Sequence, residues 1–241
     1  MNIAIIGKGR VATHLARALF SAGHEVTMCG GRHRTQPVPA EAEVVILSVK
    51  DSAISQVAQT LADSKALVLH TSGSVPMDAI PSVRRGVFYP LQTFSLDRNV
   101  DFRKIPLFLE ARTEEDMALL AQLASDISDT HMPMDGERRK TLHLAAVLCC
   151  NFVNHLYSIS HDILAEQRIP FSTLFPLMEE TLDKVRALSP HDAQTGPAVR
   201  WDENVIQSHL SMLANPIHRE IYRLLSESIH LSHTEKSAPA D

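Results

Sequence analysis

The sequence predicts an α/β protein: a doubly wound parallel sheet followed by an all-α C-terminal domain. Over the first 134 residues, short apolar runs alternate with amphipathic helical patterns, which is typical of a parallel sheet with crossover helices. From about Gly136 onward the pattern is helical. We therefore expect two domains, over 1–134 and 135–232, and a polar, disordered tail over 233–241.

The expected strands are short and rich in β-branched and other apolar residues. They cover 2–6, 24–28, 42–49, 66–70, 86–89, 107–110 and 131–134. The helices of the first domain are expected after Gly9, over 51–61, and over 117–127, where Thr113 and Asp116 resemble a capping box. Those of the second domain are expected over 137–167, 172–188, 202–213 and 215–231.

The first expected strand runs directly into a Gly-x-Gly-x-x-Ala turn and an amphipathic helix. Gly7 allows a sharp turn, Gly9 lets a phosphate approach the backbone, and Ala12 lets the helix pack closely on the strand. Free N–H groups at the start of the helix would face the anion. The pattern predicts a dinucleotide pyrophosphate site formed by Gly7, Lys8, Gly9, Arg10 and Val11. The alternative is a tight turn without a ligand.

Composition narrows the class of protein. Hydrophobic residues make up 44% and charged residues 21% of the 241 positions, as in ordinary globular proteins. A net charge of -5 argues against a general nucleic-acid binder. We see no signal peptide and no apolar run that approaches the length needed to cross a bilayer, so no membrane partner is expected.

The cysteines and histidines point to a reducing compartment and to no metal. The three cysteines are an odd number and two of them, Cys149 and Cys150, are adjacent, so a disulfide framework is not expected. Neither His-Glu-x-x-His nor Cys-x-x-Cys occurs among the many histidines and cysteines. We expect a cytoplasmic protein without a metal site.

The end of the second strand bears on the choice between NAD and NADP. An acidic residue there would bind the ribose 2′-OH of NAD, but residues 28–35 contain neither Asp nor Glu. Arg32 and Arg34 can instead hold a 2′-phosphate by charge-assisted, forked hydrogen bonds. The sequence therefore favours NADP (NADPH), and a solvated basic loop is the alternative.

Further candidates follow other strand ends, because ligands of a doubly wound sheet bind at the carboxyl ends of the strands. Ser48 and Val49 end the third strand, and Ser72 follows the fourth, so we expect all three to contact the cofactor. Ser74 in the same turn and Gln92 after the next strand are expected to contact substrate. The competing interpretation is that these residues only form turns.

The long helix expected over 137–167 carries the candidate catalytic residues. His143, Val147, Asn151 and Asn154 step by four, four and three residues and therefore share one side of an α-helix. Imidazole titrates near neutral pH, so His143 can act as a general acid, and Asn151 can position a carbonyl. We expect this side to face a cleft between the domains. The alternative is a set of interhelical or dimer-interface contacts.

Several stretches together resemble a known family. The chain resembles the DUF2520 domain fused to a Rossmann-like NADP-binding domain, which is related to pyrroline-5-carboxylate reductase and 6-phosphogluconate dehydrogenase-like proteins. The stretches that carry the resemblance are 9–19, 69–74, 89–94, 143–147 and 195–202. The resemblance implies an NADP-binding domain and a helical domain that forms a homodimer. It also implies that Thr195 and Arg200 contact substrate, as in the substrate-end loop of pyrroline reductases.

The chain departs from related families at three positions. The usual Val-Pro-Asp after the third strand has Lys50 in the middle, and the usual His-Pro-Leu-Gln begins with Tyr89. Related β-hydroxyacid dehydrogenases carry Lys-x-x-x-Asn on the long helix, where this chain has Val147 before Asn151. Our hypothesis is an NADP(H)-dependent oxidoreductase that transfers a hydride to or from a small carbonyl or imine compound. The alternative is a non-catalytic NADP(H)-binding redox sensor or regulatory protein.

Overall fold

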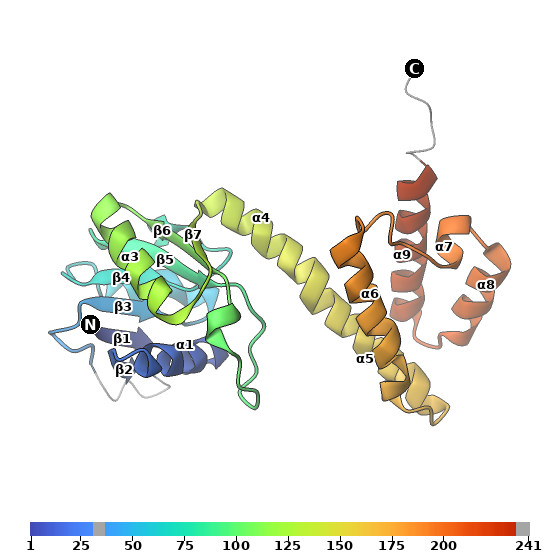
Figure 1. Cartoon of the computed structure of the whole chain (residues 1–241), viewed down its shortest axis with the longest axis horizontal. Coiled ribbons are helices and arrows are strands. Elements are labelled where there is room, and N and C mark those ends of the chain that lie inside the picture. The colour runs from blue at the N-terminus through green and yellow to red at the C-terminus, as the bar shows by residue number, and fades with distance from the viewer. Residues whose placement is uncertain (31–36, 235–241) are drawn as a thin grey trace, which may run out of the picture. The chain divides into compact units, whose positions relative to one another are not determined.

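The computed structural model describes residues 1–30 and 37–234 and divides the chain into two compact units. The first unit is Met1–Phe152 and the second is Val153–Asp241 (Figure 1). The sequence placed the boundary between residues 134 and 135. The observed boundary lies later because the helix that follows the sheet packs on the sheet over its first turns, as described below.

The first unit is built on one seven-stranded sheet, and all seven expected strands are present. The strands are β1 (Asn2–Ile6), β2 (Glu25–Cys29), β3 (Val44–Leu47), β4 (Leu67–His70), β5 (Arg85–Pro90), β6 (Leu107–Ala111) and β7 (His131–Pro133). Their spatial order is β2-β1-β3-β4-β5-β6-β7. The chain thus builds outward from β1 to β2 on one side and from β3 to β5 on the other, which creates a switch point between β1 and β3.

One pair departs from the expected parallel arrangement. Strands β5 and β6 are antiparallel, with Tyr89 opposite Phe108, whereas every other neighbouring pair is parallel. A parallel connection needs a long crossover, usually a helix. The chain between β5 and β6 contains only the short 3₁₀ turn η3 (Phe102–Lys104), so it returns in the opposite direction.

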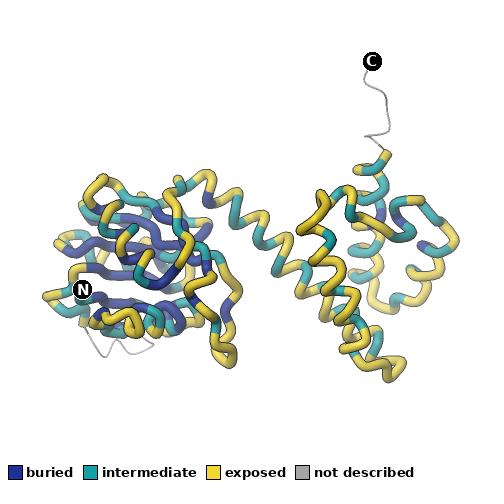
Figure 2. The backbone as a smooth tube through the Cα atoms, viewed as in Figure 1, coloured by how far each residue is buried: buried dark blue, intermediate teal, exposed yellow. Residues whose placement is uncertain are grey.

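Helices cover both faces of the sheet. On one face, α1 (Arg10–Ser21) and α3 (Glu114–Ile127) bury Leu15, Leu19, Leu120 and Leu123 against strand residues such as Ile46. The other face is covered by η1 (Asp51–Ala53), α2 (Ile54–Gln59) and η2 (Met77–Ala79). Figure 2 shows the resulting core as a band of buried backbone along the strands.

The expected long helix is interrupted by a π-helical turn. It comprises α4 (Gly136–Ala146), the π segment η4 (Val147–Phe152) and α5 (Val153–Glu166). A π-helix holds more residues per turn than an α-helix. The α-helical spacing that placed Asn151 and Asn154 on the side of His143 therefore no longer applies beyond Val147. The position of Asn151 and Asn154 relative to His143 therefore stays a prediction.

Residues 136–166 also form the one helix of the described chain that is long and apolar enough to span a membrane by length and composition. The sequence reading saw no such run, because asparagine, histidine and serine interrupt the apolar residues. Residues 141–160 nevertheless contain no Asp, Glu, Lys or Arg, so the stretch is apolar enough to span a membrane. A helix of a soluble protein can pass the same test, and cytoplasmic location stays a prediction.

The second unit is helical, as expected, but buries few side chains. It contains α5, η5 (Phe171–Leu174), α6 (Phe175–Ala187), α7 (Pro197–Arg200), α8 (Glu203–Met212) and α9 (Pro216–Thr234). Helix α7 lies in a stretch read as a loop. Helix α9 reaches Thr234, so the first two residues of the expected tail are helical, and residues 235–241 lie outside the described residues.

Candidate active site

The glycine turn after β1 has the form that a pyrophosphate site needs. Gly7 has φ = +141°, and a Cβ at this position would lie 2.1 Å from the Ser48 carbonyl oxygen, so only glycine fits. Gly9 begins α1 without a side-chain cap, and the first turn carries no acidic residue. A Cβ on Gly9 would meet nothing within 4 Å. The uncapped N–H groups of α1 therefore face open space that an anion can fill.

The other residues predicted to bind the cofactor differ in how far they are exposed. Lys8 and Arg10 are exposed beside the turn, and Val11 is half-buried against the core of α1. Val49 is half-buried and packs on the α2 side of the sheet. The predicted 2′-phosphate ligands Arg32 and Arg34 lie outside the described residues.

The ends of β3 and β4 meet beside the glycine turn. The buried Ser48 donates its N–H to the Ile6 carbonyl at 2.9 Å, and its Oγ accepts from Thr71 Oγ1 at 3.4 Å. The Ser72 hydroxyl accepts the N–H groups of Ser74 and Val75, each at 3.1 Å. Ser72 thus stabilises the turn after β4. Turn formation was the alternative to cofactor binding that the sequence analysis gave for this residue.

His143 approaches this turn from α4. A Cβ on Gly73 would lie 2.7 Å from the imidazole Cγ and Nδ1 of His143, so the close contact requires glycine at position 73. The Tyr89 hydroxyl lies 3.0 Å from the same Nδ1, and the two rings meet edge-on with centroids 6.0 Å apart. The structure therefore brings the predicted His143 together with two residues, Tyr89 and Gly73, that sequence reasoning did not assign.

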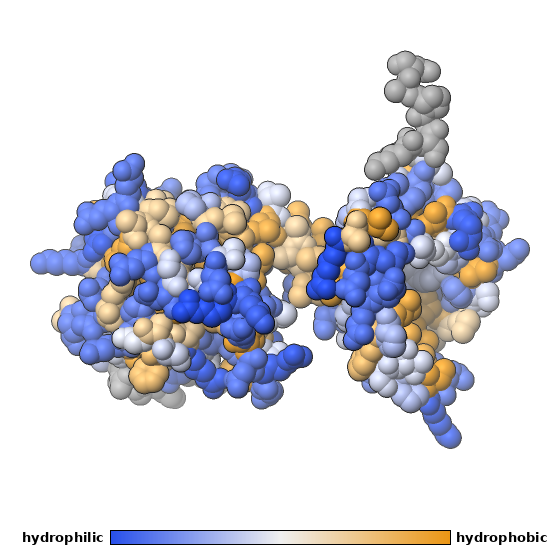
Figure 3. All heavy atoms as spheres, in the orientation of Figure 1, coloured by the Kyte–Doolittle hydropathy of each residue, from blue (hydrophilic) through white to orange (hydrophobic). Residues whose placement is uncertain are grey.

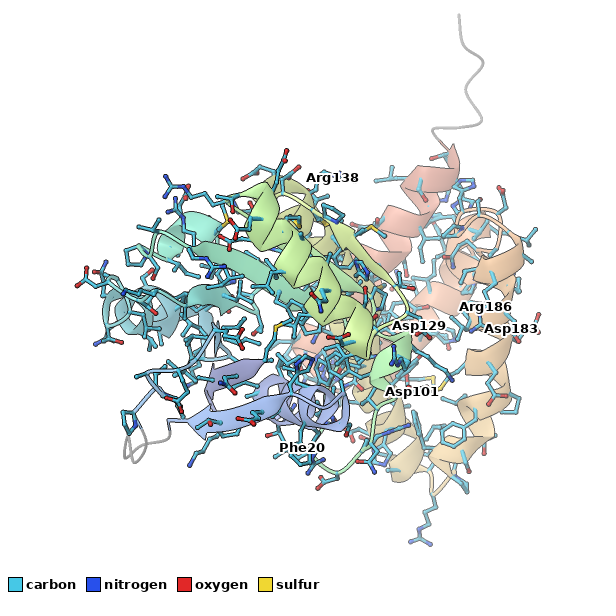
Figure 4. The ribbon with its side chains drawn as sticks, turned by 60° about the vertical axis from the view of Figure 1, so that its left-hand side comes forward. Phe20, Asp101, Asp129, Arg138, Asp183 and Arg186 are labelled. Atoms are coloured by element: carbon cyan, nitrogen blue, oxygen red, sulfur yellow. The ribbon has the colours of Figure 1, made fainter. Side chains whose placement is uncertain are left out.

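Arg139 anchors α4 to the sheet one helical turn before His143. Its side chain is fully buried and donates to a Glu110 carboxylate oxygen on β6 and to the Val75 carbonyl at 2.7 Å. The adjacent Arg138 is exposed (Figure 4). Arg139 lies in a charged run that reads as a solvated face.

Burial and the Arg139 charge set the protonation states of the neighbouring groups. Burial lowers the pKa of His70 to about 4, and the Arg139 cation adds to this shift. His70 is therefore neutral at neutral pH, and its Nδ1 accepts the Ser72 N–H at 3.2 Å. Burial raises the pKa of Tyr89, although Arg139 acts in the opposite direction, so its phenol is neutral as well.

The contacts form a continuous arc along the carboxyl edge of the sheet. Gly7 touches Ser48, Ser48 bonds to Thr71, and Gly73 touches His143. The arc places an anion site at one end and an imidazole–phenol pair at the other. This arrangement can bind a phosphate-bearing ligand at one end and present a proton donor at the other end of the same edge of the sheet.

The remaining predicted substrate-contacting and catalytic residues are exposed. Gln92 is exposed and its Oε1 accepts its own neighbour's N–H, from Thr93 at 2.8 Å. Ser74 and Asn151 are exposed, and Thr195 and Arg200 are exposed residues of the second unit. Their roles stay predictions. Within residues 1–30 and 37–234, no group of three or more His, Cys, Asp or Glu has the arrangement of a metal site.

The switch point, the uncapped helix and the glycine turn define a Rossmann-like dinucleotide-binding unit, here joined to a helical unit. A family model described as a domain of unknown function, DUF2520, matches residues 105–229. The chain belongs to this DUF2520 family. No curated protein matches it.

Solved structures agree with this assignment. A protein named "putative NADP oxidoreductase" from Bacteroides fragilis is 43% identical, with 95% of this chain and 97% of that chain covered and a TM-score of 0.89. The pyrroline carboxylate reductase of Plasmodium falciparum, with NADP bound, is 8% identical over 95% and 98% of the chains, with a TM-score of 0.62. An imine reductase of Myxococcus stipitatus in complex with NADP⁺ is 12% identical over 98% and 93%, also with a TM-score of 0.62. The last two show a shared fold.

Proposed function

We propose that the protein is an NADP(H)-dependent oxidoreductase that transfers a hydride to or from a small carbonyl or imine compound. The observation that carries the proposal is the arc from the glycine turn through Ser48 and Thr71 to His143. It joins a pyrophosphate site to a proton donor along the one edge where doubly wound sheets bind ligands. The names of the related structures, which include NADP oxidoreductases and imine reductases, support the same class.

The chain's own residues divide into binding and chemistry. NADPH supplies the hydride when bound. The turn from Gly7 to Gly9 and the start of α1 hold the pyrophosphate, and Ser48 and Val49 line the path toward the reacting end. His143 donates a proton to the oxygen or nitrogen of the substrate. Asn151, Thr195 and Arg200 are proposed to contact the substrate.

NADPH binding and turnover test the proposal together. Purified protein is titrated with NADPH and NADH by tryptophan fluorescence, and NADPH absorbance is then followed with a panel of small oxo acids, ketones and cyclic imines. We expect tighter binding of NADPH than of NADH, and turnover of at least one carbonyl or imine. Failure of both nucleotides to bind would contradict the cofactor assignment. Binding of NADPH without turnover across the panel would favour the redox sensor.

We also propose that the second unit forms a homodimer. Among its described residues, α5 and α6 contain no fully buried side chain, although α6 carries Phe175, Leu177, Leu182 and Val185. Leu177 is 64% exposed and Leu182 is 54% exposed. Figure 3 shows such hydrophobic side chains on the surface of this unit. Exposed apolar area of this kind is typical of a face that a second copy covers.

The oligomeric state is measured by size-exclusion chromatography with light scattering. We expect a dimer for the wild type and dissociation for Leu182→Glu. The matched control on the same helix is Asp183→Asn, which removes the exposed ion pair with Arg186 (Figure 4) and should leave the dimer intact. A monomeric wild type would contradict the proposal.

A further inference from the structure

We propose that Tyr89 is the proton source of the active site and that His143 relays its proton to the substrate. This inference rests on the oxidoreductase function proposed above and adds a positioning residue to it. Tyr89 is the last residue but one of β5, the strand that pairs with β4. Its hydroxyl lies 3.0 Å from His143 Nδ1, within hydrogen-bonding distance.

The imidazole is held in place from several directions. Gly73 leaves room for the ring and Tyr89 contacts it edge-on. The helix that carries His143 is fixed by the buried Arg139 through Glu110 and the Val75 carbonyl. On that helix, Leu142 packs on the cluster formed by Val87, Tyr89 and Phe108. A ring fixed in this way keeps Nδ1 toward the phenol, and its other nitrogen, Nε2, points away from it.

The hydrogen bond selects one tautomer of His143. Tyr89 is buried and its phenol stays protonated at neutral pH, so the O–H donates to Nδ1. The proton of neutral His143 then resides on Nε2. The charged groups that act on the phenol are Arg139 on α4 and Asp51 on η1; Arg139 in turn pairs with Glu110 on β6 and acts on His70 on β4.

The relay supplies the proton that the reduction of a carbonyl or neutral imine requires in addition to the hydride. The substrate carbon accepts a hydride from NADPH, which is oxidised to NADP⁺, and the Nε2–H bond breaks as a new O–H or N–H bond forms on the substrate. The Tyr89 O–H proton moves to Nδ1 in the same step, so His143 remains neutral. The phenolate that results faces the buried cation of Arg139, and solvent returns its proton after product leaves.

A relay differs from a simple imidazolium acid in its pH dependence. An isolated imidazolium loses its proton near pH 6.5, so a reaction that needs it slows tenfold per pH unit above that value. With the relay, the neutral imidazole is the active form, and the rate is sustained until the phenol ionises. Removal of the Tyr89 hydroxyl should therefore change a rate that does not depend on pH into one that falls as pH rises.

The test measures kcat/KM for carbonyl reduction between about pH 6 and pH 9 in three proteins. We expect a flat profile for the wild type and for Tyr157→Phe, a control that removes the hydroxyl of a partly exposed tyrosine on α5. For Tyr89→Phe we expect a profile that falls as pH rises, with a loss of at least about tenfold between pH 6 and pH 9. A flat Tyr89→Phe profile, or a wild-type profile that falls in the same way, overturns the relay.

A second readout does not depend on turnover. Two-dimensional ¹⁵N NMR of the histidine rings reports which nitrogen carries the proton, and His143→Gln identifies the His143 signal by its loss. We expect the Nε2–H tautomer in the wild type and a mixture in Tyr89→Phe. Equal tautomers in the two proteins overturn the inference even if no substrate is found. Lack of turnover with the expected tautomer would instead contradict only the proposed oxidoreductase function.

Discussion

Gly9→Asp should separate folding from cofactor binding. Gly9 is the N-cap of α1, with φ = -78° and ψ = -179°, a conformation that aspartate adopts readily at this position. A Cβ there meets no atom within 4 Å. Aspartate is among the best N-cap residues, so we expect the free energy of unfolding to stay unchanged or to rise by a few tenths of a kcal/mol.

The same carboxylate would stand where the pyrophosphate is expected. Repulsion between two unit charges about 4 Å apart is about 1 kcal/mol in bulk water and about 4 kcal/mol near a protein surface. The pyrophosphate carries two charges, and Gly9 is exposed, so we take about 2–4 kcal/mol for the variant. Since each 1.4 kcal/mol is a factor of ten, NADPH binding should weaken by about 30- to 1,000-fold.

The assay is a fluorescence titration with NADPH, paired with thermal unfolding in the absence of nucleotide. Gly9→Asn is the matched control, because it has nearly the same shape and capping ability without the charge. We expect Gly9→Asn to bind NADPH more tightly than Gly9→Asp by at least about tenfold at low salt. Equal affinity of wild type and Gly9→Asp would refute the placement of the pyrophosphate at the start of α1.

Three further predictions follow from the anchoring of the site. Glu110→Gln leaves the buried Arg139 without its carboxylate and should lower the free energy of unfolding by about 3–5 kcal/mol. The control Glu137→Gln removes an exposed ion pair on α4 and should lower it by under about 1 kcal/mol. Equal shifts of the two variants in thermal unfolding would contradict this difference. The folded pKa of His70 lies near 4, below the unfolded value of about 6.5, so the unfolded state binds more protons between these values. The free energy of unfolding should therefore fall by about 3 kcal/mol as pH drops from 6.5 to 4. When it is measured by urea unfolding at several pH values, it should depend less on pH in His70→Asn than in the wild type. Gly73→Ala should displace the His143 ring and lower kcat/KM by at least about tenfold while the NADPH Kd is unchanged, and wild-type kinetics would argue against the close contact.

The parts of the fold that depend on local sequence were predictable. Strand β1, the turn and α1 follow within some twenty residues of each other, and Gly7 has a positive φ that favours glycine. The antiparallel β6 was missed, although its signal is the lack of a helix between residues 90 and 107. The π turn over Val147–Phe152 has no pattern that we recognised, and it changes the angular spacing of the residues that follow it.

The site was only half visible in the sequence for a related reason. His143 was assigned because imidazole on an amphipathic helix suggests chemistry, but its partner Tyr89 lies 54 positions away in the chain. That contact depends on how α4 docks on β5, which follows from the burial of Arg139 among residues of β6 and the turn after β4. A charged residue inside a charged run gives no sign of burial, so the register of α4 could not be derived beforehand.

The central claim is that His143 delivers the proton while the glycine turn holds the cofactor. The most direct measurement compares wild type and His143→Gln in single-turnover NADPH oxidation with an accepted carbonyl substrate, alongside the NADPH Kd of each. We predict a rate lower by about 10²–10⁴-fold with the Kd unchanged within about twofold, as expected for the loss of a general acid. Equal rates in the two proteins would contradict the account.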